Sequence, residues 1–315
     1  MNLSPWRILF FGTPSFAVPS LEGLLQGPDE VIAVVTQPDR EKGRGRKVVA
    51  SPVKEAVLRH GLTVLQPENV KEESFQKTVR ELQPDLIIVV AYGQILPKSL
   101  LEIPKQGAVN VHGSLLPAYR GSSPIAWAIL KGEKKTGVTT MMMDACMDTG
   151  DILLQSEVLI AERETFETLH DRLSLTGAEL LTETLKKMKI GEVRPVPQDH
   201  SKATYAPLLK KEDGRIDWKK GAEEIDRRVR AFTPWPGAYT EWSGRLLKIY
   251  SGEAKESNGQ GNPGTVAWVG AETIEVKTGS GSFLIKEVQL EGKKRMVVRD
   301  FLSGNPVPIG TVLGG

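Results

Sequence analysis

The sequence predicts a two-domain α/β protein, in which a doubly wound, mostly parallel sheet precedes a smaller all-β barrel. In the first half, short β-branched runs alternate with amphipathic stretches, as in parallel sheets whose strands are buried on both faces. After Gly191 short alternating runs recur between glycine-rich turns instead, which is typical of a small barrel. The length of 315 residues, with 40% hydrophobic and 25% charged, suits two ordinary globular domains.

The elements of the first half can be placed from these runs. Nearly continuous apolar runs predict buried strands at 7–12, 31–36, 85–93 and 107–112. Helical spacing predicts helices at 16–25, 52–59, 74–82, 124–130 and 165–189, with a further strand at 137–143. Because ligands of open α/β sheets bind outside the carboxyl ends of the strands, we expect the site where such strands end.

The second half divides at a proline-rich stretch. We expect a first domain over 1–190, a linker over 191–208, where three prolines interrupt any periodicity, and a barrel over 209–315. Alternating runs predict barrel strands at 245–252, 264–270, 273–279, 282–290 and 294–302. The formal net charge of +2 neither requires nor excludes a nucleic-acid partner, because the distribution of charge matters more than its sum.

Composition excludes several classes of site. The single cysteine, Cys146, allows no disulfide within the chain and no cysteine-based metal site, and the four histidines lack the spacing of a helical zinc motif. The stretch "GTPSF" after the first strand lacks the glycine spacing of a phosphate loop. No run approaches the roughly 18 apolar residues of a membrane span, and we expect a cytoplasmic protein.

The stretch "NVHGSLLPAYRG" carries the first candidate site. Asn110 and His112 stand two residues apart at the end of a strand, so both side chains point to the same face. Downstream, "MMMDACMDTGD" supplies three competing carboxylates, those of Asp144, Asp148 and Asp151. A carboxamide, an imidazole and one carboxylate suit oxyanion stabilisation and proton transfer. Ser114 is no evident nucleophile, because no G-x-S-x-G elbow surrounds it.

A basic stretch, "PDREKGRGRKVV", is the second candidate. Its cations, interleaved with glycines, are Arg40, Lys42, Arg44, Arg46 and Lys47. Most such runs are solvated, flexible loops. This one follows a predicted strand directly, however, and therefore emerges at the sheet edge where Asn110 and His112 lie. Glycine allows close backbone approach, so the loop can instead order on phosphates.

The motifs together resemble the formyltetrahydrofolate-dependent formyltransferases, whose pattern is Asn-x-His-x-Ser-Leu-Leu-Pro followed by Asp-x-Gly after a strand. Further stretches resemble the members that act on initiator methionyl-tRNA; they are "FFGTPSFAVPSLEGL", "QPDREKGRGRKVVASPVKEAV", "AYGQILP", "RAFTPWPGAY", "LKIYSGEA" and "LIKEVQLEGKKRM". The similarity runs from Arg7 to about Gly310. It implies a Rossmann-like catalytic domain and an OB-like, tRNA-binding C-terminal barrel.

The resemblance also implies roles for single residues. The catalytic Asn, His and Asp of the family fall on Asn110, His112 and Asp148, since only Asp148 opens the Asp-x-Gly. The folate-binding positions fall on Ser114, Leu115, Leu116, Pro117, Gln94, Ile95, Leu96 and Asp144. For the leucines and Ile95, plain core packing is the alternative. The basic stretch matches the loop that enters the tRNA acceptor stem.

The implied activity is transfer of the formyl group of 10-formyltetrahydrofolate to the amine of methionyl initiator tRNA, without a metal and by a monomer. Alternatives are formyl transfer to a purine-precursor amine, a nucleotide-sugar amine or water, and a non-catalytic tRNA-binding protein on the same scaffold. The last is expected to lack part of the triplet, which is intact here. Two positions depart from the family pattern: Ala118, where a basic residue is common, and Cys146, where a small residue is common.

Overall fold

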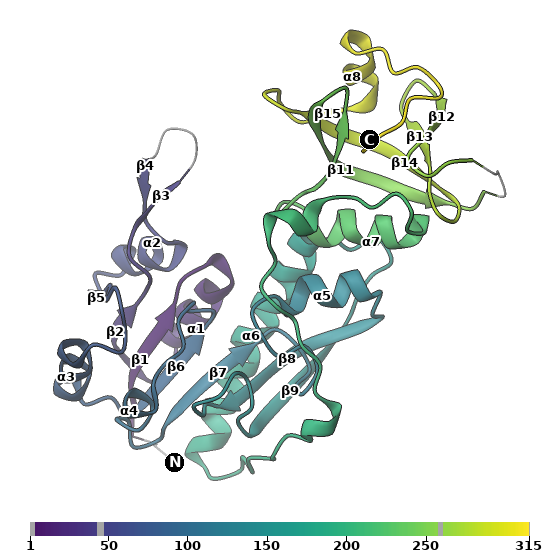
Figure 1. Cartoon of the computed structure of the whole chain (residues 1–315). Coiled ribbons are helices and arrows are strands. Elements are labelled where there is room, and N and C mark those ends of the chain that lie inside the picture. The colour runs from purple at the N-terminus through teal and green to yellow at the C-terminus, as the bar shows by residue number, and fades with distance from the viewer. Residues whose placement is uncertain (1–3, 43–46, 258–260, 315) are drawn as a thin grey trace. The chain divides into compact units, whose positions relative to one another are not determined.

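The computed structural model describes residues 4–42, 47–257 and 261–314. The chain divides into two compact units (Figure 1). The first comprises Met1–Pro124, Lys135–Leu159 and His170–Ala206, and the second Ile125–Lys134, Ile160–Leu169 and Pro207–Gly315. The predicted domain boundaries at 190 and 209 stay a prediction, while the observed division counts residues 191–206 with the first unit.

Within the described residues, the first unit is built on a seven-stranded sheet with the order β5-β2-β1-β6-β7-β8-β9. Neighbours from β5 to β7 are parallel, whereas β8 and β9 add antiparallel strands at one edge. The strands are β1 (Arg7–Gly12), β2 (Glu30–Val35), β5 (Val64–Leu65), β6 (Leu86–Val90), β7 (Ala108–His112), β8 (Lys135–Met142) and β9 (Ile152–Leu159). A separate antiparallel pair, β3 (Arg40–Lys42) and β4 (Lys47–Val49), follows β2. The doubly wound, mostly parallel sheet predicted from the sequence is confirmed.

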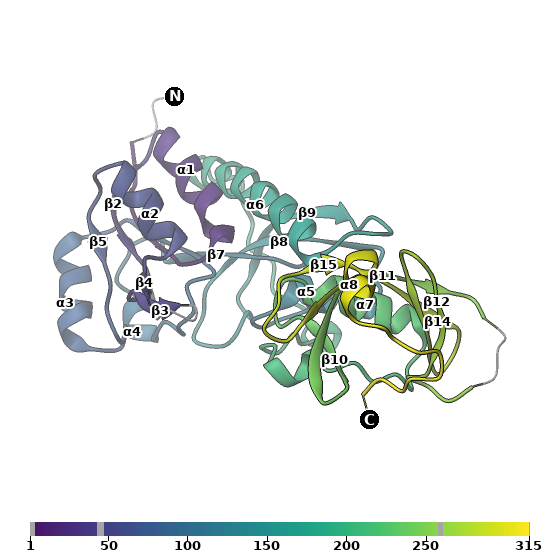
Figure 2. The same cartoon turned by 90° about the horizontal axis from the view of Figure 1, so that it is seen from above.

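Helices lie on both faces of this sheet (Figure 2). They are α1 (Val18–Gln26), α2 (Pro52–Arg59), α3 (Glu73–Leu82), α4 (Lys98–Leu101) and α6 (Phe166–Lys189). On one face, Leu9 and Ile87 share a core with Phe75 of α3 and Leu100 of α4. On the other face Gly177 of α6 approaches the strands so closely that an added Cβ would lie 3.0 Å from a methyl carbon of Val111. The sheet is therefore buried on both sides, which is why its strands read as continuous apolar runs.

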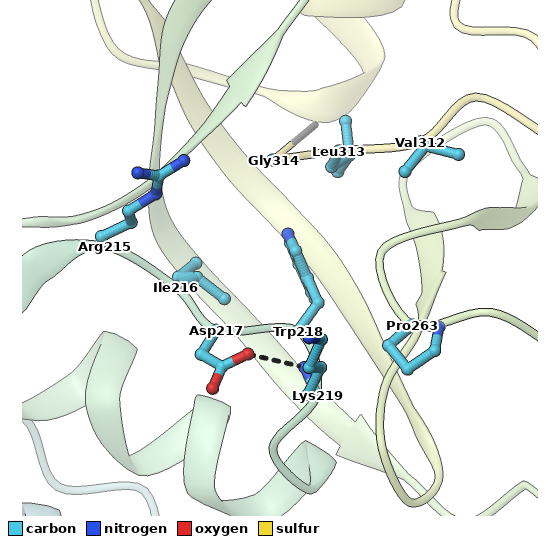
Figure 3. A pocket seen from close by; sticks show the side chains of 9 residues that line it. All are labelled: Arg215, Ile216, Asp217, Trp218, Lys219, Pro263, Val312, Leu313 and Gly314. Atoms are coloured by element: carbon cyan, nitrogen blue, oxygen red, sulfur yellow. Dashed lines mark hydrogen bonds between the residues drawn. The ribbon is translucent and has the colours of Figure 1, made fainter.

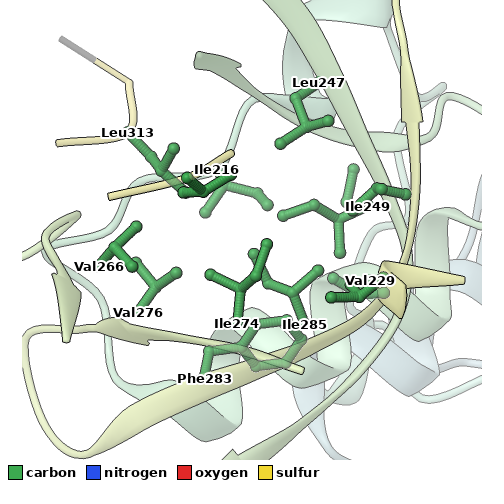
Figure 4. Close-up of a cluster of buried hydrophobic side chains, with 14 of the residues drawn as sticks. Ile216, Val229, Leu247, Ile249, Val266, Ile274, Val276, Phe283, Ile285 and Leu313 are labelled. Carbon is green, nitrogen blue, oxygen red and sulfur yellow. The ribbon is translucent and has the colours of Figure 1, made fainter. Parts of the chain in front are cut away.

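The second unit holds an antiparallel sheet with the order β10-β11-β14-β13-β12, to which β15 adds beside β14. Its strands are β10 (Ala238–Trp242), β11 (Arg245–Lys255), β12 (Val266–Val269), β13 (Ile274–Lys277), β14 (Ser282–Leu290) and β15 (Met296–Val297). Its helices are α5 (Pro124–Lys131), α7 (Ala222–Phe232) and α8 (Val298–Gly304). Ile249, Phe283 and Ile285 of the sheet enclose an apolar core with Val229 of α7 (Figure 4). The expected all-β sheet domain is confirmed.

One predicted strand is wrong. Of the run 294–302 only Met296–Val297 pairs as a strand, with β14, and Val298–Gly304 forms α8. Val298 and Phe301 are both buried. Residues three apart share one face of a helix, whereas strand alternation would put them on opposite faces. The core thus takes both side chains only when this stretch is helical.

Two further elements, α7 and β9, are not among those predicted from the sequence. The apolar residues of α7 recur at helical spacing, but they were hidden in a strongly charged stretch. Among the described residues, no helix combines the length and the apolar character that crossing a membrane requires.

Candidate active site

The candidate site begins at the carboxyl end of β7. Asn110 and His112 are 8% and 7% exposed and share one face of the strand. The antiparallel register with β8 pairs Asn110 with Met141 and His112 with Thr139, which therefore flank them on the same face. The intervening Val111 lies on the α6 face, as does Thr140, whose hydroxyl is 2.8 Å from that of Thr184 in α6. Sheet register, more than any loop, thus aims the carboxamide and the imidazole together.

The two nitrogens of His112 have different partners. Nε2 lies 3.0 Å from the carbonyl oxygen of Tyr119. Because a carbonyl oxygen can only accept, Nε2 carries a hydrogen and donates it. Nδ1 faces the carboxylate of Asp148 at 3.7 Å. Nδ1 is therefore the nitrogen that can take up or release a proton beside Asp148.

Asp148 is held by the backbone around it. It has a φ of 54°, in the left-handed region that Asp and Asn tolerate best after glycine. Its Oδ2 accepts a hydrogen bond of 2.7 Å from the backbone N–H of Gly121. Gly150, two residues on, passes so close to β8 that an added Cβ would lie 1.8 Å from the carbonyl oxygen of Met142. The "DTG" turn thus needs glycine at its third position to deliver the carboxylate to His112.

The loop after β7 is tied to β8 by hydrogen bonds. Ser114 is fully buried; its hydroxyl donates to the carbonyl oxygen of Ala118 at 2.6 Å. The hydroxyl of Thr139 donates to the carbonyl oxygen of Ser114 at 2.6 Å and accepts from the N–H of Leu116 at 3.1 Å. Ser114 thus serves the loop's shape, and its side chain is committed to the backbone.

The two leucines of this loop differ in burial and in the residues that they contact. Leu116 is buried and precedes a cis bond to Pro117. Leu115 is half-buried and lies over Gly137 of β8, where an added Cβ would come within 2.5 Å of the leucine Cδ2. Both leucines therefore pack against other parts of the protein, and their contact with folate stays a prediction.

The segment after β6 contains the other predicted folate residues. β6 neighbours β7 in parallel, so this segment opens at the same sheet edge as His112. Ile95 is 68% exposed, whereas Leu96 is buried in the core beside α3 and α4. The Gln94 carboxamide accepts from the N–H of Val70 and donates to the carbonyl oxygen of Glu68. Of the three predicted residues, only Ile95 presents an exposed apolar surface.

Asp144 lies at the start of the turn that carries Asp148. It accepts a hydrogen bond of 2.9 Å from the N–H of Cys146 and bonds of 2.7 Å from the hydroxyl of Thr149. Its carboxylate therefore shapes the turn. Cys146 itself is exposed.

The basic stretch forms the β3–β4 pair, in which Arg40 lies opposite Val49. Arg40 is exposed. Arg44 and Arg46 lie outside the described residues, as do the side chains of Lys42 and Lys47. Figure 1 shows the two strands projecting beyond the carboxyl end of β2.

A further pocket lies away from these residues. A groove of about 380 Å³ lies in the second unit (Figure 3), lined by Arg215, Ile216, Asp217, Trp218, Lys219, Pro263, Val312, Leu313 and Gly314. Within it the Asp217 carboxylate accepts from the N–H of Lys219, and the indole N–H of Trp218 is committed to Thr240. None of these residues was predicted as part of a site, and the groove lacks a carboxamide–imidazole–carboxylate set. Among the described residues, no cluster of three or more His, Cys, Asp and Glu could hold a metal ion.

A buried carboxamide and imidazole lie at the end of a parallel strand, and an Asp-x-Gly turn brings a carboxylate to them. This is the arrangement expected from the resemblance to formyl transferases. Comparison with known families agrees. Residues 6–185 match the formyl transferase model, and residues 208–306 match the formyl transferase C-terminal domain. The chain therefore belongs to the formyl transferase family, as its motifs led us to expect.

Comparison with single relatives is more specific. The methionyl-tRNA formyltransferase of Trichlorobacter lovleyi is 52% identical over 311 residues, which cover 99% of this chain and 98% of the relative. That of Caldanaerobacter subterraneus subsp. tengcongensis is 50% identical over 308 residues, covering 98% and 99%. This chain is thus an enzyme of the formyl transferase class. Both of these relatives are methionyl-tRNA formyltransferases, and the similarity covers nearly their whole length.

Solved structures share the fold at lower identity. The N-formyltransferase of Helicobacter canadensis, solved with folinic acid and dTDP-3-aminofucose, has a TM-score of 0.68 at 19% identity, covering 92% of this chain and all of that one. HypX of Aquifex aeolicus in complex with tetrahydrofolic acid has a TM-score of 0.63 at 19% identity, covering 98% of this chain and 51% of that one. At such identities the likeness shows the fold alone.

Proposed function

We propose that the chain transfers the formyl group of 10-formyltetrahydrofolate to the α-amino group of methionyl initiator tRNA. The observation that carries the proposal is the arrangement of three side chains: Asn110 and His112 share one face of β7, and Asp148 faces His112 Nδ1 at 3.7 Å. Identity of about half the residues with methionyl-tRNA formyltransferases over the full length supports the choice of acceptor.

The reaction begins with attack of the neutral amine on the formyl carbon. As the new C–N bond forms, the carbonyl electron pair moves onto the oxygen and gives a tetrahedral oxyanion. The Asn110 amide and the Nδ1–H of charged His112 donate hydrogen bonds to that oxyanion. Each such donor contributes about 3 kcal/mol to transition-state stabilisation. The carboxylate of Asp148 stabilises this imidazolium and orients its ring.

Collapse of the intermediate breaks the bond between the formyl carbon and N10 of the folate. The attacking nitrogen loses one proton and N10 gains one, so the step needs no external acid or base. Asp148 relays this proton, directly or through water, since its second oxygen is free of the Gly121 hydrogen bond.

The remaining predicted residues serve binding. The loop Ser114–Pro117 holds the folate against the triplet. Gln94, Ile95 and Leu96 form one wall of the folate site, of which Ile95 is the exposed part. Asp144 shapes the turn that faces this wall. The basic stretch, that is Arg40, Lys42, Arg44, Arg46 and Lys47, contacts the phosphates of the acceptor stem. The catalytic domain is 1–190, and 209–315 adds further tRNA contacts.

The test is formyl transfer from 10-formyltetrahydrofolate to three acceptors in parallel: methionyl initiator tRNA, methionyl elongator tRNA and glycinamide ribonucleotide. Transfer to the initiator alone supports the proposal. Transfer only to the ribonucleotide keeps the chemistry of the triplet but overturns the acceptor. No transfer to any acceptor points to a tRNA-binding protein on a catalytic scaffold.

A further inference from the structure

The segment expected to be a linker carries a buried glutamine that touches the turn of Asp148. Gln198 is 6% exposed. Its Nε2 donates to the carbonyl oxygen of Asp148 at 2.9 Å and to that of Gly150 at 2.7 Å. One side-chain amide therefore fixes the backbone on both sides of Thr149, in the turn where Asp148 adopts its positive φ.

The carboxamide oxygen of Gln198 accepts hydrogen bonds from a buried arginine. Arg120 is buried, and its Nε and Nη2 donate to Gln198 Oε1 at 3.1 and 2.7 Å. Nη2 also lies 3.1 Å from Nδ1 of His200. Two charge-assisted bonds to one carbonyl oxygen polarise the amide and strengthen its N–H groups as donors. No carboxylate pairs with Arg120 within the part of the chain that the structure describes, so the carboxamide is its main acceptor.

Backbone pairing holds this arrangement from both sides. The N–H of Arg120 donates to the carbonyl oxygen of Thr204, and the N–H of Ala206 donates to that of Arg120. Further back, Val196 and Ile152 exchange two hydrogen bonds of 2.9 Å at the start of β9. Residues 196–206 thus pair with the loop after β7 and with the strand after the Asp148 turn. Gln198 lies between them.

We propose that Gln198 is a positioning residue for the reaction, which joins the Asp148 turn to the Arg120 loop and so sets the distance between the Asp148 carboxylate and His112. Arg120 directly precedes Gly121, whose N–H binds Asp148 Oδ2. The hydrogen bonds that join Gln198 to Arg120 and to the Asp148 turn therefore hold both the Asp148 carboxylate and the backbone N–H that binds it. This inference rests on the proposed function, because it assigns Gln198 a task in that reaction.

The test compares two replacements of Gln198 by single-turnover formyl transfer to methionyl initiator tRNA. Gln198→Met keeps the volume and removes every polar contact. Gln198→Glu keeps an acceptor for Arg120, now a charged one, but cannot donate to the carbonyls of Asp148 and Gly150. We expect both to lower the single-turnover rate about 10- to 100-fold, with the KM for folate and tRNA changed less than about 2-fold.

A double variant separates positioning from general destabilisation. If Gln198 acts through Asp148, Gln198→Met makes the Asp148→Asn enzyme no slower than Asp148→Asn alone. The matched control is Gln76→Met in α3, where a buried glutamine also donates to a backbone carbonyl, that of Lys71. The control is expected to lower stability without lowering the rate.

Three results would overturn the inference: an unchanged rate in Gln198→Glu, rate losses that multiply in the double variant, or an equal loss in Gln76→Met. Gln198→Glu keeps the test decisive if Gln198→Met fails to fold, since the Arg120 pairing stays in place. Activity of the unmodified enzyme is measured first. Its absence would count against the proposed function, whereas normal activity with insensitive Gln198 variants would count against the positioning role alone.

Discussion

The Asp148 carboxylate lies 3.7 Å from Nδ1 of His112, beyond a hydrogen bond but within ion-pair distance, while its Oδ2 is bound to a backbone N–H at 2.7 Å. The other ring nitrogen of His112 is committed to a backbone carbonyl. In the proposed reaction Nδ1 is therefore the nitrogen that donates to the substrate oxygen, with the Asp148 carboxylate beside it. The predictions below follow from this geometry and its supports.

Asn110→Ala removes one of the two proposed oxyanion donors. Since Asn110 lies in a strand whose backbone pairing with β8 does not involve the side chain, we expect the fold to persist. The single-turnover rate is expected to fall about 100- to 1,000-fold with folate affinity nearly unchanged. Rapid-quench formyl transfer and a folate titration measure the two quantities. A loss confined to folate affinity would move Asn110 from catalysis to binding.

Arg44→Ala and Arg40→Ala in the basic stretch test its phosphate contacts. Each is expected to raise the KM for methionyl initiator tRNA about 10-fold and to reduce the slope of log affinity against log salt by about one, while the folate KM stays constant. The measurement is tRNA affinity at several salt concentrations. Arg59→Ala in α2 is the control, because this exposed arginine pairs with Glu22 and has no assigned role. Unchanged salt slopes in both variants would refute the tRNA role of the stretch.

Gly150→Ala tests the close approach that shapes the Asp148 turn. An added Cβ would lie 1.8 Å from the Met142 carbonyl oxygen, so the backbone must shift. We expect a loss of about 1–3 kcal/mol in unfolding free energy and a fall in turnover of about 100-fold. Gly304→Ala is the control, since no atom lies within 4 Å of its added Cβ. Normal turnover in Gly150→Ala would show that the turn tolerates displacement.

Tyr92 links pH to stability. Burial raises the pKa of its phenol to about 12 from the usual 10.0. The folded chain keeps this proton at pH values where the unfolded chain has lost it, so the group's contribution to stability is complete below pH 10 and is lost as the pH rises toward 12. Urea unfolding between pH 8 and pH 11.5 should therefore show a decline that Tyr92→Phe reduces.

The same variant has a second expected effect. The Tyr92 hydroxyl is buried and finds no hydrogen-bond partner among the described residues. Tyr92→Phe is therefore expected to raise the unfolding free energy at pH 7 by about 1 kcal/mol. A loss of stability would indicate that the hydroxyl has a partner in solution.

Much of the fold was predictable because strand and helix periodicities are strong in this chain. The buried strands around Ile87 and Val109 read as apolar runs because helices cover both sheet faces. The stretch around Phe301 misled because the short apolar run Met296–Val298 resembles a strand, although the buried Val298 and Phe301 stand three apart, as on one face of a helix. The predicted cytoplasmic location and monomeric state stay predictions.

The catalytic candidates were accessible from motifs, but their supports were not. Tyr119 and Gly121 hold His112 and Asp148 through backbone atoms, and such contacts leave no signal in the sequence. Gln198 sits in a proline-rich, aperiodic stretch that reads as a linker. Only the pairing of residues 196–206 with the first unit reveals it, because contacts across 50 and 78 positions leave no local pattern.

The most direct test of the account is single-turnover formyl transfer to methionyl initiator tRNA by Asp148→Asn, with folate and tRNA affinities measured on the same preparation. The asparagine keeps the shape of the carboxylate but cannot stabilise an imidazolium or carry the amine proton. We predict unchanged affinities, unchanged unfolding free energy within about 1 kcal/mol, and a rate lowered at least about 1,000-fold. A rate within about threefold of the unmodified enzyme would contradict the central claim that Asp148 and His112 act together on the transferred formyl group.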